Sequence, residues 1–152
     1  MKRSPLLLLI TLLSCSLMAK EYAPLNAQTL DSQTIKSLGK VTYLKFWATW
    51  CSYCIEEMPL LERSYEQAKG GYQVVAVNIG FNQSERGVRA FLQKHQYQFP
   101  TVFDVSGEIT QQFKVLGTPQ HILIDEHGQE IYRSALFTDE LKTLLETYQG
   151  GN

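Results

Sequence analysis

Two cysteines separated by two residues, Cys51 and Cys54, constrain this chain more than any other feature. A disulfide between them closes a very small ring, and the chain-entropy model extrapolated to so short a loop gives it about 2 kcal/mol. Such a bond is a weak staple but can form and break readily, so we interpret the pair as a redox-active dithiol. The alternatives are a structural disulfide and a zinc site. Zinc would need two further thiolate or imidazole ligands, and the three histidines, His95, His121 and His127, are scattered singly.

The residues around the dithiol place it between a strand and a helix. Residues 41–47 are β-branched and aromatic, which is typical of a buried strand. After the cysteines, apolar residues recur at helical spacing, namely Ile55, Met58, Leu61 and Tyr65. Unpaired N–H groups at the start of that helix favour a thiolate, so we expect Cys51 to be the more exposed, attacking thiol with a lowered pKa. Cys54, one turn further on, is expected to be buried and to resolve the mixed disulfide.

The order of the predicted elements indicates an α/β fold. Strands are predicted at 41–47, 73–79, 99–103, 120–125 and 129–134, and helices at about 52–69, after Ser84, at 107–114 and after Thr138. The last two strands flank a turn and predict a hairpin. Residues 20–38 are polar and irregular, with a weak helical pattern at 32–38. Strands that alternate with helices and end in a hairpin and a helix predict a central mixed β-sheet flanked by helices.

Two stretches of the chain resemble a known family. Phe46–Pro59 resembles the active-site segment of the TlpA/ResA-like branch of the thioredoxin superfamily, whose members are extracytoplasmic thiol–disulfide oxidoreductases. Gly117–Gly128 is similar to the family's cis-proline loop and the strand and turn that follow it. The resemblance implies a thioredoxin fold, with about 80–115 as a central strand–helix insertion. It also implies a cis bond before Pro119 that holds the Thr118 backbone against the dithiol, where it can pair with a substrate strand.

Two charged residues accompany the dithiol. Glu57 matches an acidic position that the family places near the thiols, where it can couple to thiol ionisation and proton transfer; the alternative is a solvated glutamate in the first helical turn. Lys45 departs from the family, because thioredoxins have a buried aspartate there and many TlpA/ResA-like proteins a neutral residue. A lysine beneath the thiols would favour thiolate and make the disulfide more oxidising. Alternatively, its stem is buried while its ammonium pairs with Glu57 or reaches solvent.

Three further residues carry expectations about the site. Trp50 and Tyr53 are expected on a rim that contacts substrate. His121, two residues past Pro119, is expected in the packed face of its strand, as a satisfied core histidine rather than a proton shuttle. Pro59 is expected to kink the active-site helix.

The start of the chain, residues 1–19, has the pattern of an export leader. A positively charged start precedes an apolar run at 6–13 that is too short to span a bilayer comfortably. Leu-Leu-Ser-Cys, ending at Cys15, resembles a bacterial lipobox, which is cleaved before the cysteine and lipidated on its thiol. Cleavage after Ala19 and an uncleaved membrane anchor are the alternatives. All three predict one thioredoxin-like domain, 20–152, in the periplasm or otherwise outside the cytoplasm, a setting that favours disulfides.

The predicted function is disulfide exchange with protein substrates that carry thiols or disulfides, without a cofactor. The resemblance favours a reductase, and the dithiol is expected to be recharged by a membrane electron donor or acceptor. A formal net charge of −1 and the lack of a basic patch give no indication of nucleic acid binding.

Two alternative functions use the same fold. A thiol peroxidase needs Thr or Ser where this chain has Ala48 and Pro where it has Leu44; a Cu(I) metallochaperone would use the soft thiolates but lacks a Met/His cluster near them.

Overall fold

The computed structural model describes residues 20–150. The leader and the predicted lipidation site Cys15 therefore lie outside the described residues.

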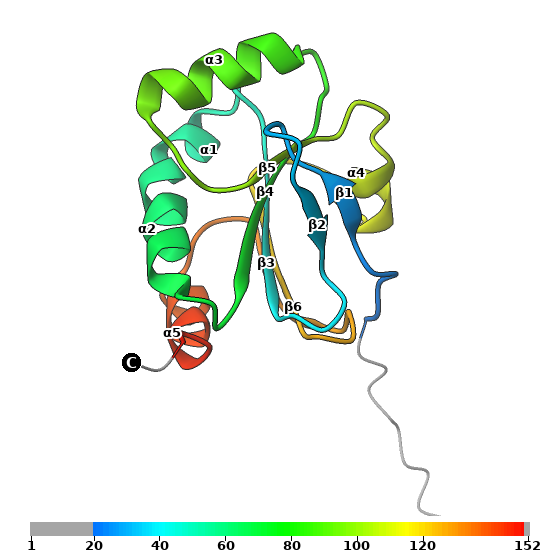
Figure 1. The fold of residues 1–152 in the computed structure, drawn as a ribbon, viewed down its shortest axis with the longest axis vertical. Helices are drawn as coiled ribbons and strands as arrows, with labels where there is room; N and C mark the ends of the chain where they lie inside the picture. Colours follow the sequence, from blue (N-terminus) through cyan, green and yellow to red (C-terminus); the bar gives the residue numbers. More distant parts are fainter. Residues whose placement is uncertain (1–19, 151–152) are drawn as a thin grey trace, which may run out of the picture.

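A five-stranded mixed sheet forms the centre of the described chain, with the strand order β5-β4-β3-β6-β7 (Figure 1). Its strands are β3 (Thr42–Trp47), β4 (Gln73–Asn78), β5 (Thr101–Phe103), β6 (Gln120–Ile124) and β7 (Glu130–Ser134). The central strand β3 pairs parallel with β4 and antiparallel with β6, which forms the predicted hairpin with β7. The mixed sheet of a thioredoxin fold is thereby confirmed.

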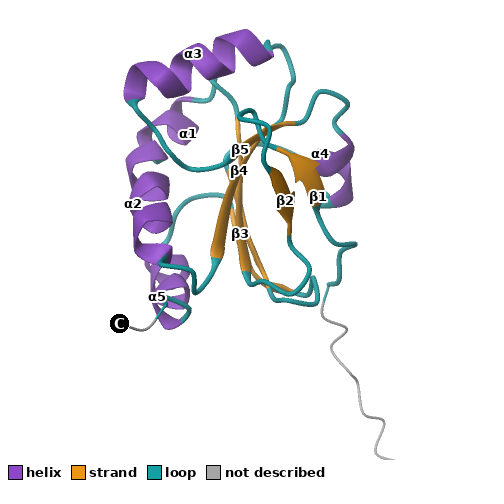
Figure 2. Cartoon of the chain, in the orientation of Figure 1, coloured by secondary structure: helices purple, strands orange, loops and turns teal. Residues whose placement is uncertain are grey.

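Within residues 20–150 the helices are α1 (Ser52–Glu56), α2 (Met58–Ala68), α3 (Glu85–His95), α4 (Glu108–Gln112) and α5 (Asp139–Thr147). Figure 2 shows α1, α2, α3 and α5 on one side of the sheet and α4 on the other. The predicted caps form, since the Ser84 hydroxyl accepts a hydrogen bond from the Gly87 N–H and the Thr138 hydroxyl accepts one from the Leu141 N–H. The insertion implied at about 80–115 consists of α3, β5 and α4.

The structure corrects the prediction for residues 20–38. Instead of an irregular segment with a helical pattern, it shows an antiparallel hairpin of β1 (Asn26–Gln28) and β2 (Thr34–Lys36). Thr29 closes the turn, because its hydroxyl accepts a hydrogen bond from the Gln33 N–H at 3.0 Å. Ile35 is buried and its two neighbours are exposed, which is the alternation typical of a strand. Its side chain packs into the apolar cluster that contains Leu44 and Phe46. Tertiary packing therefore overrides a weak local pattern.

The predicted single helix at 52–69 is also divided. α1 ends at Glu56, α2 begins at Met58, and Glu57 lies between them. Pro59 occupies the first turn of α2, a position that needs no intrahelical N–H bond. Glu57 keeps a right-handed helical backbone, and its N–H still donates to the Tyr53 carbonyl oxygen. The division is thus the kink expected at Pro59, and this break determines where the Glu57 side chain is presented.

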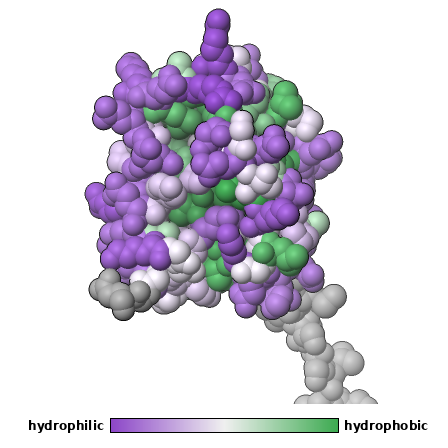
Figure 3. Space-filling view, in the orientation of Figure 1, coloured by the Kyte–Doolittle hydropathy of each residue, from purple (hydrophilic) through white to green (hydrophobic). Residues whose placement is uncertain are grey.

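Each face of the sheet has its own buried cluster, and β3 contributes alternate side chains to both. Leu44 and Phe46 pack with the β1–β2 hairpin and α4. Tyr43 and Trp47 pack with α1, α2, α3 and α5. Lys45, between them in the alternation, therefore faces the active-site helix, and it is fully buried. On the face shown in Figure 3, polar residues cover most of the surface and apolar residues show between them.

Candidate redox site

Cys51 and Cys54 form a disulfide at the start of α1, with their Cα atoms 5.2 Å apart. Cys51 is the N-cap residue of α1, and its Sγ accepts a hydrogen bond from the Cys54 N–H at 3.2 Å. The dithiol therefore lies at the positive end of a helix, as expected from the sequence. Cys51 retains 7% exposure, whereas Cys54 has none. A partner can therefore reach Cys51 more easily than Cys54.

The peptide bond between Thr118 and Pro119 is cis, as the family resemblance implied. Pro119 is buried, and β6 begins at the next residue, Gln120. The Thr118 hydroxyl is a buried group without a hydrogen-bond partner in the described part of the chain. Leu116, two residues before Thr118, is fully exposed. The loop thus combines a fixed backbone with an uncovered apolar side chain.

Glu57 is the centre of a buried polar network. Its Oε2 accepts from the Lys45 ammonium at 2.8 Å and from the His121 Nε2 at 2.9 Å. Its Oε1 accepts from the Phe137 backbone N–H at 2.6 Å. The His121 Nδ1 lies 2.7 Å from the Tyr43 hydroxyl. The alternative of a solvated glutamate is wrong, because the Glu57 side chain is only 12% exposed and accepts hydrogen bonds from three donors.

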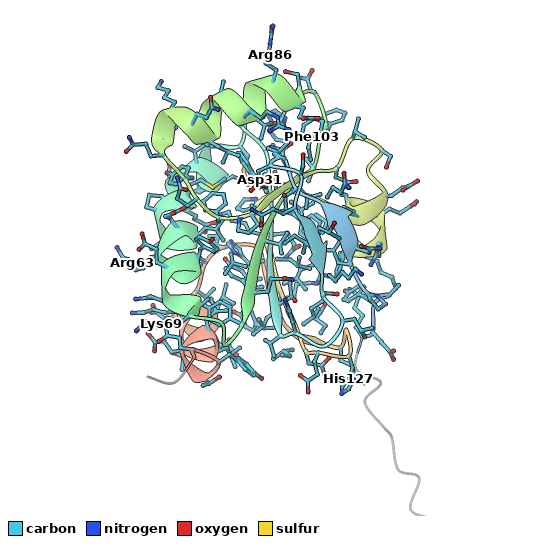
Figure 4. All side chains as sticks on the ribbon, viewed as in Figure 1. Asp31, Arg63, Lys69, Arg86, Phe103 and His127 are labelled. Carbon is cyan, nitrogen blue, oxygen red and sulfur yellow. A yellow bond between two sulfur atoms is a disulfide. The ribbon has the colours of Figure 1, made fainter. Side chains whose placement is uncertain are left out.

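The structure also settles how Lys45 is accommodated. Its side chain is fully buried and pairs with Glu57, so the pairing alternative holds and the solvent-exposed one does not. His121 lies directly opposite Lys45 in the register of β3 and β6. It is the satisfied core histidine that the sequence indicated, but its partners are Tyr43 and Glu57 rather than apolar packing alone. Figure 4 shows His127 at the far end of the molecule from α1, outside this network.

Burial and hydrogen bonding together define the protonation states of the network. Burial acts to raise the pKa of Glu57, but the hydrogen bonds from His121, Lys45 and the Phe137 amide outweigh it and lower that pKa to about 2. Burial lowers the pKa of His121, and hydrogen bonding to Glu57 opposes this only in part. Burial also raises the pKa of Tyr43 well above its usual value. At neutral pH, Glu57 is a carboxylate, His121 is neutral and the Tyr43 phenol keeps its proton.

These protonation states determine which group donates in each hydrogen bond of the His121 imidazole. The Tyr43 O–H donates to Nδ1 of His121, and the Nε2–H of His121 donates to Glu57. Burial lowers the pKa of Lys45, while its hydrogen bond to Glu57 acts in the opposite direction. Lys45 and Glu57 therefore form an ion pair inside the protein, next to a neutral imidazole.

An exposed aromatic pair borders the disulfide. Trp50 is 52% exposed, and its Nε1–H donates to the Phe81 carbonyl oxygen at 2.9 Å. The two rings meet edge to face, with centroids 6.4 Å apart. Tyr53 is also exposed. Trp50 and Tyr53 were expected on this rim, whereas the sequence analysis missed Phe81.

The pairing of β3 with β4 explains why Phe81 lies beside Trp50. The strands are parallel, so their carboxyl ends meet at one edge of the sheet and their following loops are neighbours. A hydrogen bond from the Thr49 N–H to Gln83 Oε1 at 2.7 Å ties the loops together. The signal that could have revealed Phe81 was therefore the strand order rather than a motif.

Within residues 20–150, no group of three or more His, Cys, Asp or Glu side chains is arranged to hold a metal ion. The same range contains no helix with the length and apolar character needed to cross a membrane.

Comparisons with known proteins agree with this geometry. The family model described as Redoxin matches residues 18–146. The chain is 35% identical over 111 residues to the thioredoxin-like protein YneN of Bacillus subtilis, a match that covers 71% of this chain and 65% of that protein. It is 32% identical over 111 residues to the thiol-disulfide oxidoreductase ResA of Bacillus thuringiensis, covering 72% of this chain and 62% of that protein. The chain thus spans just under two thirds of these relatives.

A solved structure of similar fold comes from Streptococcus pneumoniae. It is the exposed lipoprotein thioredoxin Etrx1, which is 26% identical to this chain and superposes with a TM-score of 0.73. The superposition covers 82% of this chain and 99% of that one.

Proposed function

Because the chain belongs to the redoxin family and, within the thioredoxin superfamily, to the ResA-like group, we propose that it is an extracytoplasmic thiol–disulfide oxidoreductase that reduces disulfides in protein substrates. One observation carries this proposal. The Cys51–Cys54 disulfide caps α1, with the more accessible sulfur hydrogen-bonded to a helix N–H. The names of the ResA relatives support the same reaction class.

The reaction begins with the reduced dithiol. The Cys51 thiolate, stabilised by the helix N-terminus, attacks one sulfur of a substrate disulfide. The substrate S–S bond breaks, its second sulfur leaves as a thiolate that takes up a proton, and Cys51 is joined to the substrate in a mixed disulfide. Cys54 then loses its proton and attacks the Cys51 sulfur. The Cys51–Cys54 disulfide forms, the substrate thiol is released, and two electrons have passed to the substrate.

The surroundings of the dithiol would hold the substrate during exchange. We assign the Thr118 backbone, presented by the cis bond to Pro119, to hydrogen bonding with an extended substrate segment. The exposed rings of Trp50 and Tyr53 would contact side chains on either side of the substrate cysteine. A membrane electron donor would return the dithiol to its reduced form.

The proposed location depends on residues 1–19. We propose that they direct export, that Cys15 is lipidated and tethers the domain formed by 20–152, and that this domain therefore lies outside the cytoplasm. The description of the pneumococcal protein as an exposed lipoprotein supports this arrangement. A Cys15→Ser variant should move from the membrane fraction to the soluble periplasmic fraction. Retention of that variant in membranes would point to an uncleaved anchor, and an unchanged soluble distribution of both forms would point to cleavage after Ala19.

The exchange reaction is tested with three cysteine variants. Cys51→Ser should abolish reduction of a protein disulfide by dithiothreitol-recharged enzyme, and Cys54→Ser should accumulate mixed disulfides visible on non-reducing gels. Cys15→Ser serves as the control and should keep full exchange activity. Trapping by Cys51→Ser instead would reverse the two roles, and full activity of both active-site variants would refute the proposal.

The direction of electron flow needs a separate measurement. Potentials of this fold range from about −270 mV for thioredoxin to about −120 mV for a strong oxidant. A reductase should equilibrate with glutathione near the lower end. A value near the upper end would assign the protein to disulfide formation instead.

A further inference from the structure

Lys45 is an unusual residue for its position in the fold. It lies on the central strand β3, on the face that α1 and α2 cover, and none of its side chain reaches solvent. An ammonium group loses its hydration in such a place, and that loss is tolerated only if an anion and hydrogen-bond acceptors compensate it. The anion is Glu57, whose Oε2 lies 2.8 Å from the ammonium nitrogen.

The Glu57 carboxylate accepts hydrogen bonds from three donors. Oε2 receives the Lys45 ammonium and the His121 N–H, and Oε1 receives the Phe137 amide N–H. The Lys45 ammonium and the Phe137 N–H can only donate, so a proton on either oxygen would face an obligatory donor, and only His121 Nε2 could accept it, after a change of tautomer. The contacts themselves thus oppose protonation of Glu57.

The network links four segments of the redox site. Glu57 comes three residues after Cys54, at the break between α1 and α2. His121 comes two residues after the cis proline Pro119, and Phe137 lies in the loop between β7 and α5. One carboxylate therefore connects the active-site helix, the central strand, the cis-proline segment and the last loop.

We propose that Lys45 is a positioning residue that fixes Glu57 as a permanent anion, so that Glu57 does not exchange protons with the dithiol and the two charges act on Cys51 as a compensated pair. This inference rests on the proposed disulfide exchange for its effect on Cys51, but the pairing itself is independent of activity. It replaces the proton-transfer role that the family resemblance implied for Glu57. The other titratable groups that act on the pair are His121 and Tyr43, and Tyr72 acts in turn on Tyr43. Cys54 lies in α1, which ends immediately before Glu57.

The first experiment follows the Glu57 carboxyl carbon by NMR during a pH titration of the oxidised protein. The wild-type signal should stay that of a carboxylate down to about pH 3. In Lys45→Met the midpoint should rise by about 1–3 units, because an opposite charge in contact lowers a carboxyl pKa by that amount. Lys142→Met is the matched control, because that lysine is exposed and lies 3.9 Å from Glu146, and it should leave the midpoint unchanged.

Two results would overturn the pairing. One is a wild-type midpoint above about pH 5, and the other is a midpoint in Lys45→Met within a few tenths of the wild-type value. If Lys45→Met does not fold, Lys45→Gln gives the same comparison with a neutral donor in place of the cation. Because the oxidised protein is used, these results stand whether or not the chain catalyses exchange.

The second experiment measures the Cys51 pKa from the pH dependence of alkylation of the reduced protein. Lys45→Met should decrease the thiolate fraction at a given pH, by up to about tenfold, and Glu57→Gln should increase it. The double variant Lys45→Met/Glu57→Gln should return close to wild type. An unchanged Cys51 pKa in both single variants, or a double variant further from wild type than either single one, would refute the compensated pair. Loss of exchange activity in Cys51→Ser remains the separate test of the function itself.

Discussion

The two faces of strand β3 are equally buried but have different roles. Leu44 and Phe46 face a cluster made of apolar side chains. Tyr43 and Lys45, their neighbours in the chain, face the polar network around Glu57. Apolar burial adds stability in proportion to the area removed from water. A buried ion pair gains little net stability, because desolvation offsets the attraction. Both faces therefore bury apolar side chains, but only the face of Tyr43 and Trp47 also holds an ion pair and its hydrogen-bonded neighbours.

The strongest test of this division is Phe46→Ala. The Phe46 ring is fully buried and packs against Phe113, with ring centroids 5.8 Å apart. Loss of the ring leaves a cavity and should lower the free energy of unfolding by about 3–5 kcal/mol, measured by denaturant unfolding of the oxidised protein. The reduction potential of the folded protein should be unchanged. A potential shifted by more than about 30 mV, which corresponds to 1.4 kcal/mol, would show that the two faces are coupled.

On the other face, Glu57→Ala should have the next largest effect. It leaves the Lys45 ammonium buried without its anion and removes the acceptor of the His121 and Phe137 N–H groups. Breaking a buried pair in this way should cost on the order of 3 kcal/mol. Glu57→Gln should cost less, since its amide oxygen still accepts hydrogen bonds. Equal unfolding free energies for the two variants would show that shape, rather than the missing acceptor, causes the loss.

The difference between the faces also explains what the sequence could predict. The β-branched and aromatic run at 41–47, the caps Ser84 and Thr138 and the hairpin after Pro119 follow local patterns, so the sheet and most helices were predicted correctly. The β1–β2 hairpin was missed, because Ile35 is buried through a tertiary contact that no local pattern records.

The site shows the same limit. The positions of Cys51 and Cys54 at the helix start follow from spacing and helix periodicity. The network does not, since His121 and the Phe137 amide reach Glu57, and Tyr43 reaches His121, only after β3 pairs with β6 and the last loop folds over the break between α1 and α2. The sequence predicts that Lys45 and Glu57 lie near the dithiol. Only the fold identifies His121 and the Phe137 amide as further partners of Glu57.

The pH dependence of the free energy of unfolding should distinguish the two faces of β3, because Glu57 and His121 belong to the network on one face only. The folded pKa of Glu57, about 2, lies below its usual 4.5, so the unfolded chain binds the proton more readily and stability falls as pH decreases from about 4.5 towards 2. The lowered pKa of His121 acts in the same direction, starting below its usual 6.5. Urea unfolding at pH 7, 5.5 and 3 should show both steps, and Glu57→Gln should lack the lower one. Phe46→Ala, in contrast, should keep the wild-type pH profile at reduced stability; a profile altered by that variant would contradict the division.

The smallest expected effect concerns an ion pair of similar geometry at the surface. Arg89 and Glu85 on α3 lie 2.7 Å apart, close to the 2.8 Å of Lys45 and Glu57, but their side chains are 43% and 53% exposed. Water and salt screen such a pair, so a double-mutant cycle with Glu85→Gln and Arg89→Gln should give a coupling of about 0.3–0.5 kcal/mol. The cycle also cancels the separate interaction of Glu85 with the first turn of α3.

The same cycle with Lys45→Met and Glu57→Gln should give a coupling several times larger, because each single change leaves a buried charge without its partner. Raising the salt concentration should weaken the surface coupling and leave the buried one nearly unchanged. Similar couplings at both pairs would mean that water reaches Lys45 and Glu57 in solution. In that case the polar face of β3 would hold a hydrated pair, and the comparison with the apolar face would lose its physical basis.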